Sequence, residues 1–93
     1  MPRLVMKFGG TSVANLDRIR NAAERVRLEV EKGYDVIVIV SAMSGKTNEM
    51  VGWVNETSPL YDAQEYDAVV SSGENITAGL MALTLQKMNI PAR

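Results

Sequence analysis

The residues best suited to chemistry lie in two short segments of the 93-residue chain, 7–12 (KFGGTS) and 41–47 (SAMSGKT). Each segment combines glycine, hydroxyl side chains and one lysine. Adjacent glycines let backbone N–H groups approach an anion closely, and a lysine adds a mobile positive charge. This combination favours phosphate binding. The simpler interpretation of the first segment is that Gly9-Gly10 forms only a strand-to-helix turn and that Lys7 is a solvated strand residue.

Three further polar residues have a structural as well as a chemical interpretation. Ser41 stands where a hydrophobic run ends, and it is either a binding residue or an ordinary strand end. Thr47 can cap a helix that begins at Asn48 by accepting a backbone N–H. Ser71 and Glu74 have the spacing of a capping box, in which the glutamate only closes a helix start. The residues by themselves leave both interpretations open.

A P-loop is the obvious alternative for the second segment, because Gly45-Lys46-Thr47 follows a hydrophobic run. The P-loop pattern needs another glycine five positions before Gly45, and Val40 occupies that position. The pattern therefore does not favour a P-loop.

Composition narrows the chemistry further. The net charge is −1, and the chain has no cysteine and no histidine, which removes thiol nucleophiles, disulfides, thiolate metal sites and the usual neutral-pH base. Ten basic and eleven acidic residues nearly cancel, so no nucleic-acid footprint is expected. No apolar run is long enough for a membrane span or a signal peptide, so we expect a cytoplasmic protein. No residue is singled out as a metal ligand.

The first half of the chain has the pattern of a βαβ unit. Residues 3–8 place Leu4, Met6 and Phe8 on one side and Arg3, Val5 and Lys7 on the other, which predicts a half-buried strand. A helix then begins at a cap, Asn15 or Asp17, and ends before Gly33, where a left-handed C-terminal cap is expected. Residues 35–40 (DVIVIV) have no polar face, which predicts a strand buried on both faces of a parallel sheet.

The helix of this unit is expected to be amphipathic. Its predicted apolar stripe comprises Leu16, Ile19, Ala23, Val26 and Val30. Charges of both signs alternate on the opposite face, which predicts a solvated surface rather than a basic patch. The predicted i,i+4 ion pairs are Arg20–Glu24, Arg25–Glu29 and Arg27–Glu31.

The second half of the chain predicts helices. We expect a short helix over 48–55, a modest one over 62–71, and a longer one from Gly73 to Met88. The last helix is apolar on two sides and needs cover on both. Residues 90–93 resemble the entry to another strand, and a two-stranded sheet is marginal by itself. We therefore expect the chain to be a fragment of a longer protein.

The motifs carry a resemblance to a known family. Segment 7–14 (KFGGTSVA) closely resembles the opening signature of aspartate kinases, in the amino acid kinase superfamily. Segments 40–47 (VSAMSGKT) and 71–74 (SSGE) resemble that family's second and third motifs in order and separation. The resemblance spans essentially the whole chain. A shorter KxGG pattern would be shared with acetylglutamate, glutamate 5-phosphate-forming and uridylate kinases.

The resemblance implies a three-layer αβα sandwich with a mostly parallel sheet, of the α/β class. It also implies transfer of the ATP γ-phosphoryl group to the side-chain carboxylate of L-aspartate, giving 4-phospho-L-aspartate, with Mg2+ bound alongside the nucleotide. This reaction begins lysine, threonine and methionine biosynthesis. A homo-oligomer is expected.

Residue roles follow from the same resemblance. Lys7 is the catalytic residue, which contacts the transferred phosphoryl group. The residues expected to bind ATP are Lys7, Phe8, Gly9, Gly10 and Ser12. The residues expected to bind aspartate are Ser41, Thr47 and Glu74, the last pairing with the α-ammonium group. The acceptor carboxylate is already ionised at pH 7, so no general base is needed.

Family members continue into a nucleotide-binding half and then into regulatory ACT domains. Residues 1–93 are therefore expected to be the N-terminal part of the catalytic domain and to be inactive alone. Two alternatives stay open. One is another kinase of the superfamily that acts on a different carboxylate. The other is a non-catalytic interaction module that dimerises through the helix from Gly73 to Met88.

Overall fold

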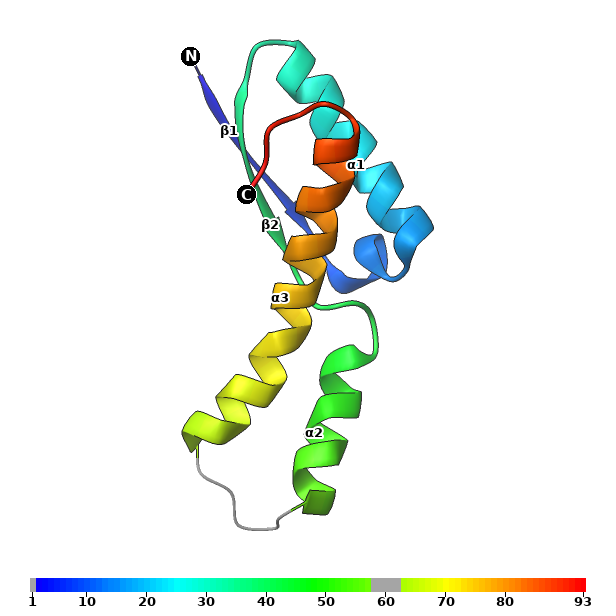
Figure 1. Ribbon diagram of the computed structural model, residues 1–93, viewed down its shortest axis with the longest axis vertical. Helices are drawn as coiled ribbons and strands as arrows, with labels where there is room; N and C mark the ends of the chain where they lie inside the picture. Colours follow the sequence, from blue (N-terminus) through cyan, green and yellow to red (C-terminus); the bar gives the residue numbers. More distant parts are fainter. Residues whose placement is uncertain (1, 58–62) are drawn as a thin grey trace.

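The computed structural model describes residues 2–57 and 63–93 (Figure 1). The elements follow one another in the order β1 (Arg3–Phe8), the 3-10 helix η1 (Gly10–Val13), α1 (Leu16–Glu31), β2 (Asp35–Val40), α2 (Lys46–Thr57) and α3 (Ala63–Lys87). No helix in these described ranges is both long and apolar enough to cross a membrane.

The two strands pair in parallel, as the sequence predicts. The register runs from Arg3 opposite Asp35 to Phe8 opposite Val40. One more ladder bond lies beyond the strand ends, where the Ser41 N–H donates to the Phe8 carbonyl at 3.2 Å. Because parallel strands point the same way, both carboxyl ends lie at one edge of the sheet. The predicted α/β class with a parallel sheet is confirmed.

The limits of α1 also agree with the sequence. The Asn15 side chain accepts a hydrogen bond from the Arg18 N–H at 2.9 Å, so Asn15 is the cap and Asp17 lies in the first turn. Gly33 has a φ of 98°, a left-handed conformation that glycine adopts without a steric penalty. In the predicted apolar stripe Leu16 is exposed, and the buried residues of α1 begin about one turn later, at Ile19.

The charged face of α1 is solvated, but its pairing differs in detail from the prediction. Of the three expected i,i+4 pairs, Arg27–Glu31 forms, at 2.6 Å. The other contacts use i,i+3 spacing, which brings side chains equally close on a helix. They are Arg20–Asp17, Arg27–Glu24 and Lys32–Glu29. The Arg27 hydrogen bond holds the pKa of Glu24 below its usual value.

One face of the sheet carries the core. Helices α1 and α3 pack on this face, and the buried cluster comprises Phe8, Val13, Ile19, Ala22, Ala23, Val26, Met81 and Leu85. On the opposite face Val5, Ile37 and Ile39 are 57%, 47% and 47% exposed. The prediction that strand 35–40 is buried on both faces is therefore wrong for this chain. The strand has two apolar faces, but helices cover only one of them.

Helix α3 takes the place of the two separate helices that the sequence predicts over 62–71 and from Gly73 to Met88. α3 runs without a break from Ala63 to Lys87, through the predicted boundary at Gly73. The expected start at Asp62 lies outside the described residues. Within α3 the Ser71 hydroxyl donates to the Ala68 carbonyl at 3.5 Å, one turn back in the same helix, so Ser71 does not cap a new helix. The capping interpretation of Ser71 and Glu74 is therefore wrong.

The glycine at the predicted boundary is present for packing. A Cβ built on Gly73 would lie 2.6 Å from Met50 Cε and 3.0 Å from Ala42 Cβ. A helix can approach its neighbours this closely only where it has no side chain. Helix α2 also differs from its prediction, since it begins at Lys46 rather than Asn48, so Thr47 lies inside the helix and is not its cap.

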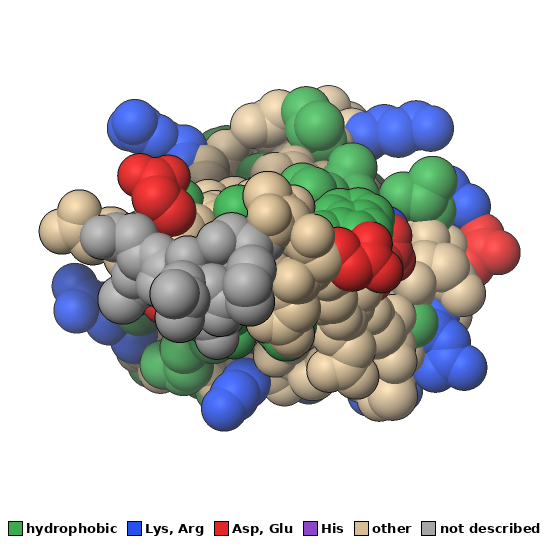
Figure 2. Space-filling model, turned by 90° about the horizontal axis from the view of Figure 1, so that it is seen from below, with side chains coloured by type: hydrophobic (Ala, Val, Ile, Leu, Met, Phe, Trp, Pro, Cys, Tyr) green, Lys and Arg blue, Asp and Glu red, His purple; other side chains and the backbone are tan. Residues whose placement is uncertain are grey.

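The molecule is elongated, with extents of 50 × 25 × 18 Å. The cause is the α2–α3 hairpin, which consists of α2 and the N-terminal half of α3 (residues 46–57 and 63–75) and extends beyond the sheet (Figure 1). Viewed from that end, hydrophobic side chains remain visible at the surface and Lys and Arg side chains project around the rim (Figure 2).

Candidate functional site

The two glycine-containing segments leave the same edge of the sheet and are held together there. The Ser44 N–H donates to the Gly10 carbonyl at 3.2 Å, which joins the turn after β1 to the loop after β2. Within the first turn, the Ser12 N–H donates to the Gly9 carbonyl at 3.0 Å. The two segments therefore meet at one edge of the sheet.

The two adjacent glycines serve different purposes. A Cβ on Gly10 would lie 2.9 Å from the Ala42 carbonyl oxygen and 3.5 Å from the Ser44 nitrogen, so any side chain there would push the two segments apart. The space around Gly9 is open, with no atom within 4 Å of a Cβ position. Within residues 2–57 and 63–93, neither the Gly9 N–H nor the Gly10 N–H donates a hydrogen bond. These donors remain available to a ligand.

Lys7 and Phe8 point to opposite faces of β1, because side chains alternate along a strand. Phe8 is 9% exposed and belongs to the core, which fixes the end of the strand. Lys7 is exposed on the face that no helix covers, and Ser12 is exposed in η1. In the described part of the chain, the side chains of Lys7 and Ser12 form no hydrogen bond or ion pair.

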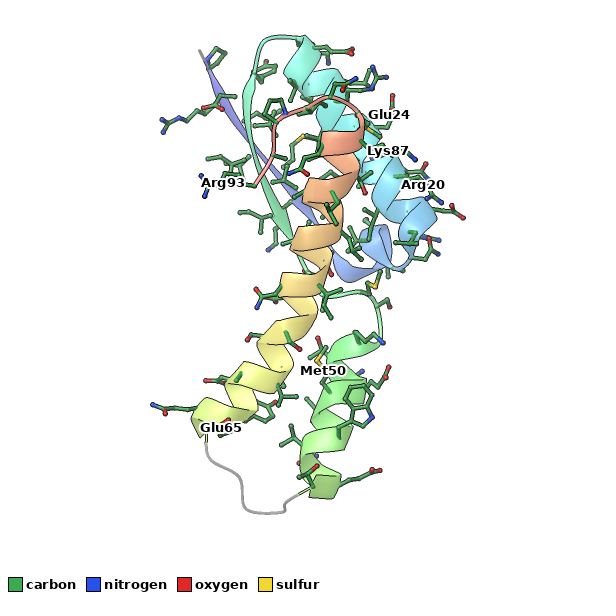
Figure 3. The ribbon with its side chains drawn as sticks, in the orientation of Figure 1. Arg20, Glu24, Met50, Glu65, Lys87 and Arg93 are labelled. Atoms are coloured by element: carbon green, nitrogen blue, oxygen red, sulfur yellow. The ribbon has the colours of Figure 1, made fainter. Side chains whose placement is uncertain are left out.

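The segment after β2 connects this edge to α3. Ala42 is buried and packs directly against Gly73. Met50 reaches the same point from α2 and lies between α2 and α3 (Figure 3). The middle of α3, including Glu74, is thereby placed beside the sheet edge. The sequence contains no signal for this junction other than the glycine, which suggested a helix boundary.

Each of the three residues expected to bind aspartate lies within three positions of Ala42, Met50 or Gly73 in the sequence. Ser41 follows β2 directly, Thr47 lies in the first turn of α2, and Glu74 follows Gly73 on α3. Thr47 and Glu74 are exposed and Ser41 is partly buried. Among the described residues, none of the three side chains has a hydrogen-bond or ion-pair partner. By contrast, Lys46 next to Thr47 pairs with Glu49 at 3.5 Å.

One residue that positions the first segment is not predicted by the sequence. The Arg18 guanidinium donates to the Thr11 carbonyl at 3.0 Å and so ties α1 to η1. Arg18 also lines a hollow of about 180 Å3 together with Ser12 and Arg25. Since the contact joins residues seven positions apart across a turn, helix periodicity gives no indication of it.

The available groups define what this edge can bind. An ammonium group, backbone N–H groups and hydroxyls are donors that match the oxygens of a phosphate. In the ranges that the structure describes, no three Asp, Glu, His or Cys side chains gather in a metal-binding arrangement. The edge is therefore chemically suited to an anion.

Comparison with known proteins assigns a family to this geometry. The profile of the amino acid kinase family matches residues 2–93. An aspartokinase of Rickettsia felis is 49% identical over 96 residues, covering 100% of this chain and 24% of the relative. An aspartokinase of Pseudomonas aeruginosa is 45% identical over 92 residues, covering 99% of this chain and 22% of the relative. The chain thus spans about a quarter of the length of the curated relatives it matches.

A solved structure of an aspartate kinase also matches this chain. The crystal structure of an aspartate kinase from Synechocystis superposes with a TM-score of 0.88 and 38% sequence identity. The match covers 91% of this chain and 15% of that chain. The βαβ unit and helices described above therefore correspond to part of a larger α/β kinase structure.

Proposed function

The chain belongs to the amino acid kinase family, and from that premise we propose that residues 1–93 form the N-terminal part of the catalytic domain of an aspartate kinase. The intact enzyme would transfer the γ-phosphoryl group of ATP to the side-chain carboxylate of L-aspartate and form 4-phospho-L-aspartate. This acyl phosphate is the first intermediate towards lysine, threonine and methionine. Two observations support the assignment of these residues to only part of a domain. The chain matches about a quarter of the length of its relatives, and one face of its sheet is uncovered.

One observation carries the proposal: two glycine-containing turns are joined at the carboxyl edge of a parallel sheet, with unused N–H donors and an exposed lysine beside them. Ligands of open α/β sheets bind outside this edge. Phosphoryl transfer depends mainly on positioning and on stabilising charge on the transferred oxygens. Lys7 would stabilise that charge, and the Gly9 and Gly10 N–H groups would hold the same oxygens.

The residues of the first segment fit a nucleotide bound through its phosphates. Gly9 leaves its backbone open, Ser12 adds a hydroxyl, and Phe8 anchors the strand end through the core while its backbone lies between lysine and glycines. Magnesium bound with the nucleotide would offset part of the phosphate charge. Among the described residues, no three Asp or Glu side chains gather to hold this ion.

The acceptor side matches an amino acid. The Glu74 carboxylate would pair with the α-ammonium group, and the Ser41 and Thr47 hydroxyls would donate to carboxylate oxygens. The acceptor carboxylate of aspartate is ionised at pH 7 and attacks without losing a proton. A chain without histidine can therefore carry this chemistry.

Two further expectations belong to this proposal. Residues 1–93 alone would not turn over, because members of the family continue into a nucleotide-binding half that completes the sheet, and one face of the sheet is uncovered here. The intact enzyme would be a cytoplasmic homo-oligomer, as suits an ATP-dependent step of amino acid biosynthesis.

The test is an acceptor assay on the intact protein that contains this chain. L-aspartate, L-glutamate, N-acetyl-L-glutamate and uridylate are each supplied with Mg-ATP, and ADP release is measured together with hydroxamate formation from trapped acyl phosphate. We expect turnover with aspartate at least 100-fold above the others. Turnover with another acceptor would identify a different kinase of the family, and no turnover with any acceptor would favour an interaction module.

Glu74→Gln sharpens the acceptor assignment. Loss of a hydrogen bond to a charged group costs about 1.5–3 kcal/mol, so the KM for aspartate should rise about 10- to 100-fold. Glu56→Gln, another exposed helical glutamate, is the matched control and should leave the KM unchanged. An unchanged KM in the Glu74 variant would remove this residue from the acceptor site.

A further inference from the structure

The guanidinium of Arg18 is connected to the turn after β1 through a short series of hydrogen bonds. It donates to the Thr11 carbonyl at 3.0 Å. The next N–H along the chain, that of Ser12, donates to the Gly9 carbonyl at 3.0 Å. A peptide unit is planar, so fixing a carbonyl also fixes the N–H of the following residue. The two bonds therefore orient the peptide plane before Ser12 and the peptide plane before Gly10 together.

This series ends at a group of the proposed phosphate site. The peptide plane between Gly9 and Gly10 carries the Gly10 N–H, which donates no hydrogen bond within the described residues. A guanidinium bound to the Thr11 carbonyl also polarises that peptide unit, and hydrogen bonds in series strengthen one another. Arg18 therefore acts on both the direction of the Gly10 N–H and its strength as a donor.

The start of α1 fixes the place of Arg18. The Asn15 side chain accepts a hydrogen bond from the Arg18 N–H at 2.9 Å, so the helix cap holds the backbone from which the guanidinium reaches the turn. The adjacent carboxylate, that of Asp17, is paired with Arg20. In the described parts of the chain Arg18 forms no ion pair, so its positive charge is not neutralised and favours an anion beside the turn.

We propose that Arg18 is a positioning residue for ATP, which orients the Gly10 N–H toward the phosphate oxygens through the Thr11 carbonyl and the hydrogen bond from Ser12 to Gly9. The inference rests on the proposed function for the nucleotide and is independent of the acceptor. Donors that are oriented before the substrate binds need no reorganisation when charge develops in the transition state. Because the Arg18 contact is exposed, its loss should affect the use of ATP more than folding.

Steady-state kinetics of the intact protein with Mg-ATP test this role. Arg18→Ala should lower kcat/KM for ATP about 10- to 100-fold, because a misplacement of about 1 Å in an active site can cost about 10²-fold. The KM for aspartate should stay near its wild-type value. Arg20→Ala is the matched control, since it removes a guanidinium of the same helix that pairs with Asp17. An unchanged kcat/KM for ATP in the Arg18 variant would overturn the proposal.

Arg25 separates the hydrogen bond from the general effect of positive charge. It lines the same hollow as Arg18 and Ser12, and among the described residues its side chain has no hydrogen-bond or ion-pair partner. Arg25→Ala should therefore lower kcat/KM for ATP much less than Arg18→Ala does. Equal losses would show that ATP requires positive charge near the turn rather than the contact with Thr11, and the proposal would fail.

Chemical rescue separates positioning from a loss of structure. Methylguanidinium, added well below denaturing concentrations, can occupy the space left in Arg18→Ala and donate to the Thr11 carbonyl. It should raise kcat/KM for ATP in this variant several-fold and leave Arg20→Ala unaffected. Circular dichroism checks folding, and Arg18→Gln, which keeps part of the apolar stem, replaces Arg18→Ala if the latter does not fold. No recovery in a folded variant would refute the positioning role.

Calorimetry of Mg-ATP binding keeps this inference apart from the acceptor assignment, because binding needs no acceptor. Arg18→Ala should weaken Mg-ATP binding several-fold. If the wild-type protein binds Mg-ATP but phosphorylates an acceptor other than aspartate, the proposed acceptor is wrong and the weakened binding still supports the role of Arg18. Unchanged binding and turnover in Arg18→Ala, with aspartate as the acceptor, would refute the role of Arg18 alone. If the wild-type protein binds no Mg-ATP, the phosphate site and this inference both fail.

Discussion

The sheet end of the molecule and the α2–α3 hairpin are held by very different amounts of buried surface. At the sheet end, β1, β2, α1 and the C-terminal half of α3 share one cluster of buried side chains. In the hairpin, Met50 is the buried residue of α2, and it packs against Gly73 of α3. Since local stability follows buried apolar contact, the hairpin depends on few interactions.

This difference matters for the proposed reaction. The residues proposed to hold phosphate follow or belong to β1 at the well-packed end, whereas Thr47 and Glu74 lie on the hairpin. A rigid phosphate site keeps its donors in place for charge that develops in the transition state. The proposed acceptor residues Thr47 and Glu74 lie instead beside a close contact of Gly73 with Met50 and Ala42, which joins two helices and a loop. Four experiments test this contrast.

The largest expected effect is on the chemistry of the sheet edge. In the intact enzyme, Lys7→Ala should lower kcat about 10²- to 10³-fold with a smaller change in the KM for aspartate, because one charge-stabilising donor is lost. Arg3→Ala is the control, since Arg3 is an exposed cation on the same face of β1 at its other end. Steady-state kinetics measure both, and an unchanged kcat in the Lys7 variant would remove Lys7 from the mechanism.

The next effect is on the core of the sheet end. Ile19 is 1% exposed, and Ile19→Ala should lower the free energy of unfolding by about 2–5 kcal/mol through lost burial and a residual cavity. Leu28→Ala on the exposed side of the same helix should cost less than about 0.5 kcal/mol. Denaturant unfolding compares the two. Equal costs would show that α1 is not held by the cluster described here.

Two glycines of α3 test the junction with the hairpin. Gly73→Ala should destabilise by about 1–2 kcal/mol, because its Cβ would lie 3.0 Å from Ala42 Cβ, which cannot rotate away as the Met50 methyl can, and this overpacking exceeds the gain in helix propensity. It should also raise the KM for aspartate, since Glu74 is the next residue. Gly79→Ala, where the space is open, should stabilise by about 0.5–1 kcal/mol. If both variants stabilise, the close approach at Gly73 is absent.

The smallest expected effect is a pH-dependent change in stability that comes from an ion pair on the surface of α1. The Arg27 hydrogen bond lowers the pKa of Glu24 in the folded chain, so this group stabilises the fold above its unfolded value of 4.5. That contribution should disappear as the pH falls through the lowered pKa. Thermal melts of wild type and Glu24→Gln should therefore differ slightly at pH 6 and converge in strong acid. In an Arg27→Ala background, the difference at pH 6 should vanish.

Local patterns predicted most of the βαβ unit, whereas the roles proposed for the site residues come from the family resemblance. Alternation in residues 3–8, the Asn15 cap and the left-handed Gly33 are each specified by nearest neighbours, and the structure agrees with all three. The boundary placed at Gly73 is wrong for an equally physical reason. Glycine breaks a helix in isolation, but here the approach of Met50 and Ala42 offsets that tendency. No local pattern reports a contact with a residue more than twenty positions away.

The sequence by itself determined the two strands, the first helix and the presence of residue types that can bind phosphate. It could do so because local hydrogen bonding and side-chain periodicity act over only a few residues. Tertiary structure alone decided that Gly10 must lack a side chain because Ala42 and Ser44 pass beside it, that α3 continues through Gly73, and that Ile37 and Ile39 stay exposed on one face. These outcomes depend on which segments meet in space, and close packing between distant segments has no signature in the order of neighbouring residues.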